Sequence, residues 1–215
     1  MIADFLKLLA KEDIVPVGTD RPMAEWLPII SLASTLTATL YVPIGNESIA
    51  SFQGDLMVVL FLLSVPTFAY FLAGWATPSV YGIVGGSRSL LQYFAYEIPF
   101  TMALLTPAIL SGTWSILQLM DAQRGYRWHA FQAPVAFMIS IVGLIGKLKR
   151  VPFDIPHART EVGPGPLTDY SGRKMAFWKL GVLLQTFVGV NLIVALFLGG
   201  ADRLWGPWGY AIYTL

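Results

Sequence analysis

A single carboxylate, Glu97, stands inside a long apolar stretch of this 215-residue chain. An ionisable side chain within a bilayer is costly, so such a residue is by default a functional candidate. Arg88, Gln92 and Tyr96 precede it at intervals of four and share one helical face. Burial favours the neutral acid and a nearby cation favours the carboxylate, and a carboxyl held between the two effects suits proton exchange. A structural glutamate, hydrogen-bonded to neighbouring helices, is the alternative.

The longest polar segment, residues 146–175, is the second candidate for chemistry. Its prolines and glycines prevent one continuous helix. Its titratable and basic residues are Asp154, Glu161, Asp169 and His157, interleaved with Lys147, Lys149, Arg150, Arg159, Arg173 and Lys174. We expect the bases to dock a soluble subunit, and the acids with the histidine to line a buried polar path. Simple anchoring of membrane topology is the alternative. Lys179, just inside the next apolar stretch, either snorkels to the interface or pairs with an acid of this segment.

Residues that bind metals are scarce. Cysteine is absent, which excludes disulfides, thiolate zinc sites and cysteine-ligated iron–sulfur clusters on this chain. The two histidines, His129 and His157, are expected on opposite sides of the membrane, so they cannot form a bis-histidine haem site. We therefore expect no catalytic residue, metal or cofactor on the chain itself, and any redox centre must lie in a partner.

The composition predicts an integral membrane protein. Hydrophobic residues make up 55% of the chain and charged residues 13%, and the mean hydropathy is +0.62. The formal net charge of +1 gives no basic field for nucleic acid. Apolar stretches long enough to span a bilayer cover residues 26–44, 56–76, 90–110, 131–145 and 176–198, with a partial span at 205–215. Because only helices satisfy the backbone within lipid, we predict one all-α, polytopic transmembrane bundle over residues 1–215.

Residues 1–22 predict an amphipathic surface helix followed by a cytoplasmic segment, because apolar residues recur at helical spacing opposite charged ones. Orientation follows from the Lys and Arg residues. Ten of them lie in residues 1–22, 77–89 and 146–175, and three lie in the other connecting segments. By the positive-inside rule, the N-terminal helix and the 146–175 segment face the cytoplasm. We expect the chain to lie in the inner (cytoplasmic) membrane.

Several motifs resemble one known family, membrane subunit 1 of complex I. They are Lys11-Glu-Asp-Ile-Val-Pro16, Ala73-Gly-Trp-Ala76, Arg88 with Gln92 and Tyr96-Glu97, and Arg150-Val-Pro-Phe-Asp154 through Glu161 to Asp169-Tyr-Ser-Gly-Arg173. These motifs run through most of the chain in the family's order and spacing. The family includes NADH–quinone oxidoreductases and energy-converting membrane-bound hydrogenases, with related sulfur-reducing complexes.

Asp154-Ile-Pro and Gly165-Pro-Leu-Thr-Asp-Tyr-Ser-Gly172 are more similar to the hydrogenase branch. The resemblance implies a membrane anchor that couples redox change to ion translocation. Its partners would be peripheral iron–sulfur and catalytic subunits at the cytoplasmic face, the latter with a nickel–iron centre in a hydrogenase, and antiporter-like membrane subunits. In the quinone branch the chain would line a quinone chamber. The acids at 97, 154, 161 and 169 would then take part in the coupling.

The chain departs from the family in two respects. His157 and Arg159 stand where members usually carry acids, which changes any proton relay in the 146–175 segment: histidine can carry protons near neutral pH and arginine cannot. Members also typically have a helix before this start and further helices after residue 198, so we expect either a fragment or a shortened relative. A stand-alone secondary transporter remains the alternative of a different class, although no inverted repeat is visible.

Overall fold

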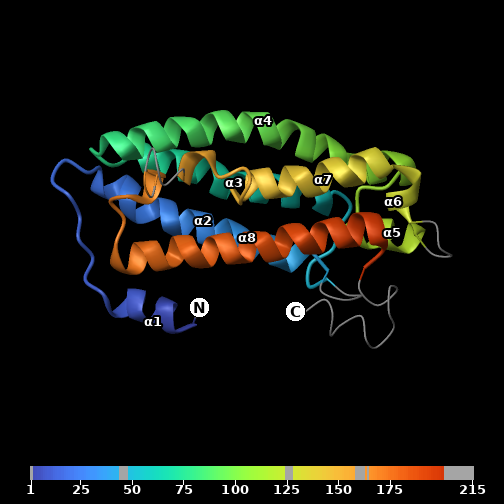
Figure 1. The fold of residues 1–215 in the computed structure, drawn as a ribbon. Coiled ribbons are helices and arrows are strands. Elements are labelled where there is room, and N and C mark those ends of the chain that lie inside the picture. The colour runs from blue at the N-terminus through green and yellow to red at the C-terminus, as the bar shows by residue number, and fades with distance from the viewer. Residues whose placement is uncertain (1, 44–47, 124–127, 158–162, 164, 201–215) are drawn as a thin grey trace.

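The computed structural model describes residues 2–43, 48–123, 128–157, 163 and 165–200. Every regular element among them is a helix, which confirms the all-α prediction. The elements are α1 (Ile2–Ala10), α2 (Arg21–Tyr41), α3 (Asp55–Trp75), α4 (Val80–Ser111), α5 (Ile116–Ala122), α6 (His129–Gln132), α7 (Pro134–Lys147), the short 3-10 helices η1 (Ile155–His157) and η2 (Gly165–Leu167), and α8 (Gly172–Leu198) (Figure 1). The partial span at 205–215 lies outside the described residues.

Four of these helices are long and apolar enough to cross a membrane: α2, α3, α4 and α8. Local signals fix their starts. Asp20 caps α2 by accepting a hydrogen bond from the Met23 N–H (3.3 Å), and Ser79 caps α4 in the same way through the Gly82 N–H (3.4 Å). The fifth predicted span, 131–145, is instead divided between α6 and the 14-residue α7, with Ala133 between them.

Helix α4 begins ten residues before the predicted start at 90, so Arg88 lies within the helix instead of in a loop. Glycines at 82, 85 and 86 indicate a loop by propensity alone. In the structure they let two backbones approach closely: a Cβ atom on Gly74 of α3 would lie 2.5 Å from the Gly82 carbonyl oxygen. Tertiary packing thus overrides the weak helix propensity of glycine here.

The apolar core has two parts, separated along the helix axes. One part joins α3, α4, α5 and the second half of α8, around Leu63, Phe100 and Leu192. The other joins the first halves of α2 and α8 to α3 and the loop before α8, around Tyr70 and Trp178. Between them, Gln185 of α8 donates hydrogen bonds to the Leu63 carbonyl and the Thr67 hydroxyl, both at 3.3 Å. A polar layer therefore crosses the bundle between two apolar regions.

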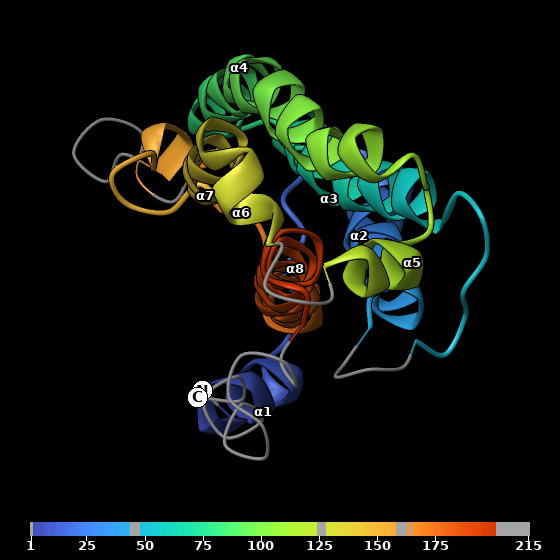
Figure 2. The same cartoon turned by 90° about the vertical axis from the view of Figure 1, so that its right-hand side faces the viewer.

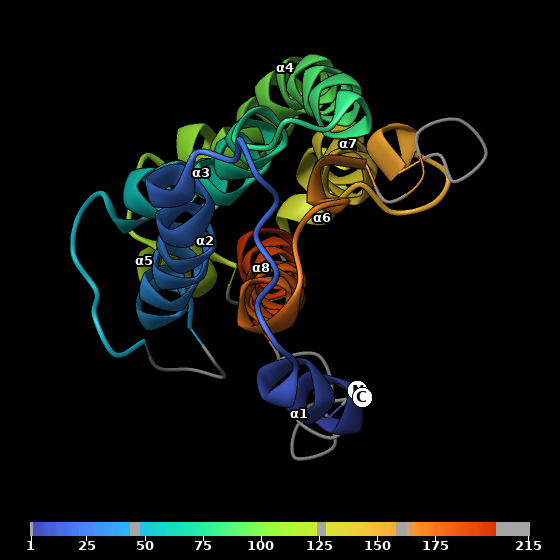
Figure 3. The ribbon, with the colours of Figure 1, turned by 90° about the vertical axis from the view of Figure 1, so that its left-hand side faces the viewer.

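Helix α1 lies beside α8, outside the main bundle, and the segment after it passes along the end of the bundle to reach α2 (Figures 2 and 3). This segment is fastened to the start of α8. The Ile14 N–H donates to Ser171 Oγ (2.9 Å), Ser171 Oγ donates back to the Ile14 carbonyl (3.2 Å), and Lys174 pairs with Asp13 (3.2 Å). We call this end, with residues 11–20, 148–157 and 165–171, the loop end.

The opposite end is fixed by buried polar side chains. Asp55 accepts a hydrogen bond from the Ile116 N–H (2.8 Å) and so caps α5, which has no cap from its own Ser115. His129 is 2% exposed, with Nε2 2.8 Å from Ser111 Oγ and Nδ1 2.9 Å from the Leu196 carbonyl. These contacts give His129 a role in joining α6 to α8.

The close contact of α3 with α4 makes Gly74 sensitive to substitution. We expect Gly74→Ala to lower the free energy of unfolding by about 1–3 kcal/mol, because the new methyl group meets backbone atoms that cannot move aside. Gly181→Ala in α8 is the matched control: its Cβ would meet only Ser31 Oγ, at 3.6 Å, so it should be neutral or stabilise by up to about 1 kcal/mol. Denaturation in detergent measures both, and equal effects would contradict the packing argument.

Candidate functional site

Glu97 lies near the middle of α4 and forms a buried ion pair. Its Oε1 atom is 2.7 Å from Nζ of Lys147, the last residue of α7. The two side chains are 11% and 2% exposed. Glu97 Oε2 has no hydrogen-bond partner among the described residues. The pair joins α4 to α7, but only one of the two Glu97 carboxylate oxygens has a partner among the described residues.

Polar and aromatic side chains surround this pair in a small pocket lined by Thr67, Gln92, Tyr93, Tyr96, Glu97, Gly146, Lys147 and Lys149. Gln92 Nε2 donates to the carbonyls of Gly146 (2.8 Å) and Phe153 (2.6 Å), which ties the loop after α7 to α4. Gln92 Oε1, like Glu97 Oε2, lacks a partner in the described part of the chain. The pocket leaves no room for a water molecule, so these two buried acceptors stay unsatisfied.

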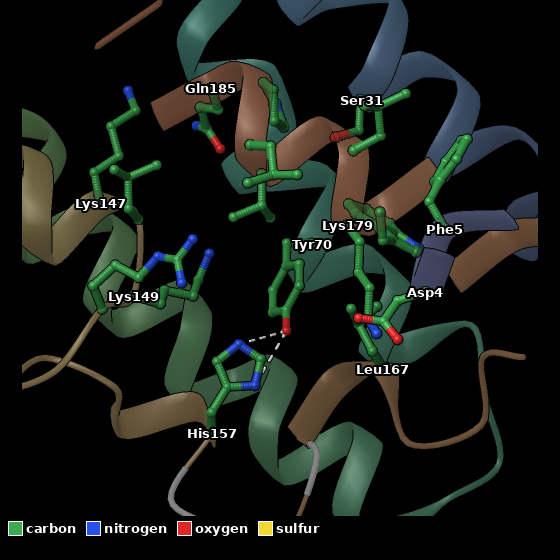
Figure 4. Close-up of a pocket in the computed structure, with 17 residues that line it drawn as sticks. Asp4, Phe5, Ser31, Tyr70, Lys147, Lys149, His157, Leu167, Lys179 and Gln185 are labelled. Carbon is green, nitrogen blue, oxygen red and sulfur yellow. Dashed lines mark hydrogen bonds between the residues drawn. The ribbon is translucent and has the colours of Figure 1, made fainter. Parts of the chain in front are cut away.

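A larger cavity of about 580 Å³ lies beside this pocket, among α1, α2, α3, α7, α8 and the loop after α7. Figure 4 shows side chains from these elements around it. Its apolar wall includes Phe5, Leu167, Trp178, Val182 and Leu183. Its polar lining is mainly basic: Lys147, Lys149, Arg150, His157 and Lys179, with Asp4 as the acid and Ser31, Tyr70 and Gln185 neutral. The cavity can therefore hold an apolar molecule and stabilise negative charge on it.

Tyr70 and His157 face one another in this cavity (Figure 4). The Tyr70 hydroxyl is 2.7 Å from His157 Nε2, and the two rings meet edge to face at 5.5 Å. Tyr70 is 4% exposed. The Nζ atom of Lys149 lies over the Tyr70 ring, 4.2 Å from its centroid. One phenol thus contacts both an imidazole and an ammonium group.

The backbone of Lys149 is left-handed, with φ of 53°. Its N–H donates to the Gly146 carbonyl, at the position after a helix where glycine is usual. Burial, with the neighbouring Lys147 ammonium, lowers the pKa of Lys149 to about 7, and Glu97 opposes this shift. A strained backbone and a cation of low basicity coincide at this residue.

Lys147 and Lys149 line both the pocket and the cavity. Both lysines therefore line interior spaces, whereas the sequence analysis predicted that they dock a soluble subunit together with the exposed cations. Of the other predicted docking residues, Arg150 and Arg173 are exposed, Lys174 is half-buried against Asp13, and Arg159 lies outside the described residues.

The predicted proton-path residues do not gather in one place. His157 lies in the cavity with Tyr70, and Asp154 is half-buried in the turn before η1. Asp169 lines a separate small pocket with Asp13 and Lys174. Glu161 is not among the described residues. Arg88 is half-buried in α4, and Lys179 is an exposed residue of α8 at the cavity.

Two residues of the site escape the sequence reasoning. Tyr70 stands in the apolar span of α3, and Trp178 resembles a member of an interfacial aromatic belt. In the structure Trp178 is 2% exposed, and its Nε1 atom has no partner among the described residues. A polar group on an aromatic side chain within an apolar span is the signal that marks both.

Comparison with known proteins gives one family and one fold. A family model described as NADH dehydrogenase matches residues 1–215. The H subunit of NADH-quinone oxidoreductase from Bacillus thuringiensis subsp. konkukian (strain 97-27) is 32% identical over 207 residues, which cover 96% of this chain and 61% of that protein. The same subunit from Bacillus cereus (strain AH187) matches to the same extent. The chain thus spans 61% of the length of these curated relatives.

The structural match is to a chain of the membrane-bound sulfane sulfur reductase, an archaeal respiratory membrane complex. The TM-score is 0.87 at 27% sequence identity, over 99% of this chain and 71% of that chain. The fold described above is therefore also found in a subunit of a respiratory membrane complex.

Lys149 allows the strain and the charge at this site to be tested separately. Lys149→Ala removes the ammonium group, and Lys149→Gly also relieves the left-handed backbone, so we expect the glycine variant to be more stable by about 1–2 kcal/mol. Relative to the unchanged protein, the free energy of unfolding of both variants should be raised most at low pH. Lys149 binds a proton in the unfolded chain up to its ordinary pKa of 10.5 but loses it near 7 when folded, so the unchanged protein itself becomes more stable as pH rises through this window. Thermal unfolding at about pH 6 and pH 9 measures this, and an alanine variant more stable than the glycine variant would contradict the strain argument.

Proposed function

Because this chain belongs to the NADH dehydrogenase family, whose model matches all 215 residues, we propose that it anchors a peripheral redox module and couples electron transfer to ion translocation. It is a multi-pass membrane subunit similar to the NADH-quinone oxidoreductase subunits of the two Bacillus species, and its resemblance to subunit 1 of complex I is confirmed. Family membership favours this role over that of a stand-alone transporter.

The buried pair of Glu97 and Lys147 is the observation that carries this proposal. A charge pair held inside a membrane bundle is weak support for stability, since desolvation offsets much of the attraction. A functional reason for keeping it is therefore favoured. The pair lies beside a cavity that can stabilise an anion, and Glu97 Oε2 has no partner among the described residues. A change of charge in the cavity can therefore act on Glu97, because its partner Lys147 lines that cavity.

We place the chain in a membrane-bound hydrogenase or a related sulfur-reducing complex. The Asp154-Ile-Pro and Gly165–Gly172 motifs favour this branch, and the likeness to the sulfane sulfur reductase chain supports it. In this proposal the iron–sulfur and catalytic subunits bind at the loop end, on the cytoplasmic face, and antiporter-like subunits bind elsewhere in the membrane. Exposed apolar side chains of α4 such as Leu91, Met102 and Ile109 face lipid or such subunits.

A second candidate function is reduction of a quinone held in the cavity. The apolar wall of Phe5, Trp178 and Leu183 suits a quinone, and the curated relatives are named as NADH-quinone oxidoreductase subunits. Metal analysis of the purified assembly distinguishes the two candidates: nickel with iron–sulfur subunits supports the hydrogenase, and iron without nickel with quinone reductase activity supports this second function.

Glu97→Gln tests the coupling role. The substitution keeps the shape and a hydrogen-bond acceptor for Lys147 but removes the exchangeable proton. We expect the assembly to form and electron transfer to continue, while the number of ions moved per electron falls. Inverted membrane vesicles carrying the whole assembly, supplied with reduced methyl viologen, allow both rates to be measured. An unchanged ratio would remove Glu97 from the pathway.

Charge reversal at the two exposed arginines tests docking at the loop end. We expect Arg150→Glu with Arg173→Glu to release the soluble subunits at lower salt than the unchanged assembly, because attraction between exposed charges is screened by salt. Lys7→Glu on the exposed face of α1 is the matched control and should leave the salt dependence unchanged. If the soluble subunits stay bound to the double variant through the same high-salt wash, the docking role is wrong.

A further inference from the structure

Lys147 stands between Glu97 and the cavity. Its Nζ atom is 2.7 Å from Glu97 Oε1, and its side chain lines both the pocket around Glu97 and the 580 Å³ cavity. The ammonium group also lies 5.1 Å from the centre of the Phe100 ring. Lysine carries its charge on a flexible four-carbon stem, so the ammonium can turn from one space to the other without movement of the helix.

Departure of this ammonium has a defined consequence for Glu97. A buried carboxylate without its cation is far less favourable than the buried neutral acid. Glu97 Oε2 has no partner among the described residues to take over that stabilisation. Glu97 must therefore bind a proton when Lys147 leaves, and release it when Lys147 returns.

We propose that Lys147 is a positioning residue that exchanges partners between Glu97 and an anion formed in the cavity. The inference rests on the coupling function proposed above. An iron–sulfur cluster of a partner subunit supplies one electron to a ligand in the cavity, and the ligand gains one negative charge. The ammonium turns to that charge, and the Glu97 carboxylate takes up one proton from the aqueous phase. Before the step, the neutral ligand, the Lys147 ammonium and the Glu97 carboxylate together carry no net charge. After the step, the ligand anion, the ammonium and the neutral Glu97 acid again carry none.

Lys149 supports this exchange from the cavity side. Its ammonium lies over the Tyr70 ring, 4.2 Å from the centroid, on the wall of the cavity. A second cation there helps to stabilise the same anion, whereas Lys147 is the residue bonded to Glu97. Each lysine therefore has a separate task.

Lys147→Met removes the ammonium and keeps an apolar stem of similar length. We expect Glu97 to be protonated in both redox states of this variant. Ion uptake by inverted vesicles supplied with reduced methyl viologen should then be lost while electron transfer continues. In reduced-minus-oxidised infrared spectra, the band of a protonated carboxyl that Glu97→Gln eliminates should also be missing. Lys7→Met, the same substitution at an exposed lysine, should change neither measurement.

The exchanged pair, Glu97→Lys with Lys147→Glu, separates switching from support of the fold. It restores a neutral buried pair, so a purely structural role predicts full recovery, whereas our inference expects assembly without ion uptake because the acid now faces the cavity. Ion uptake by the exchanged pair, or a normal carboxyl band and uptake in Lys147→Met, would overturn the inference. If Glu97→Gln still moves fewer ions per electron in that case, the coupling function proposed above stands. An unchanged ratio in Glu97→Gln removes Glu97 from the pathway and overturns the inference with it.

Discussion

The ion pair between Glu97 and Lys147 constrains the whole arrangement of α4 and α7. Neither charge is tolerable alone inside the bundle, and breaking such a pair typically costs about 3–5 kcal/mol. The helices must therefore approach closely and in one register. Glycine permits this: a Cβ atom on Gly143 would lie 3.1 Å from Phe100, and one on Gly146 would overlap the ring of Tyr96. The charge pair and the small residues beside it are parts of one interface.

The loop end depends on the same interface. Gln92 of α4 bonds the carbonyls of Gly146 and Phe153, so the chain leaving α7 is held against α4 as it turns. Gly85 of α4 receives η2, since a Cβ atom there would lie 2.8 Å from Pro166. These contacts place His157 against Tyr70 at the edge of the cavity. The basic lining of the cavity thus comes from a loop whose path α4 determines.

Hydropathy was sufficient to predict the all-helical fold and the four long helices, because the pattern of apolar residues is a local property of the chain. A lone acid in an apolar span also identified Glu97. The partner of Glu97 could not be found this way, because Lys147 is 50 residues distant in sequence and stands among other bases. The contact of Tyr70 with His157 joins residues 87 apart. The early start of α4 was missed for a related reason: its glycines weaken a local prediction and strengthen a tertiary contact.

The positions of His157 and the two lysines suggest a division of work along the chain. His157 bonds a phenol in the cavity and lines that cavity, whereas the small pocket around Glu97 is lined by other residues. Lys147 and Lys149 line both spaces and can respond to negative charge on either side. In the coupling proposed above, cations between the cavity and the buried acid transmit charge first and protons second. We infer that the basic lining of the cavity, His157 included, fits this electrostatic form of coupling better than a continuous chain of carboxylates would.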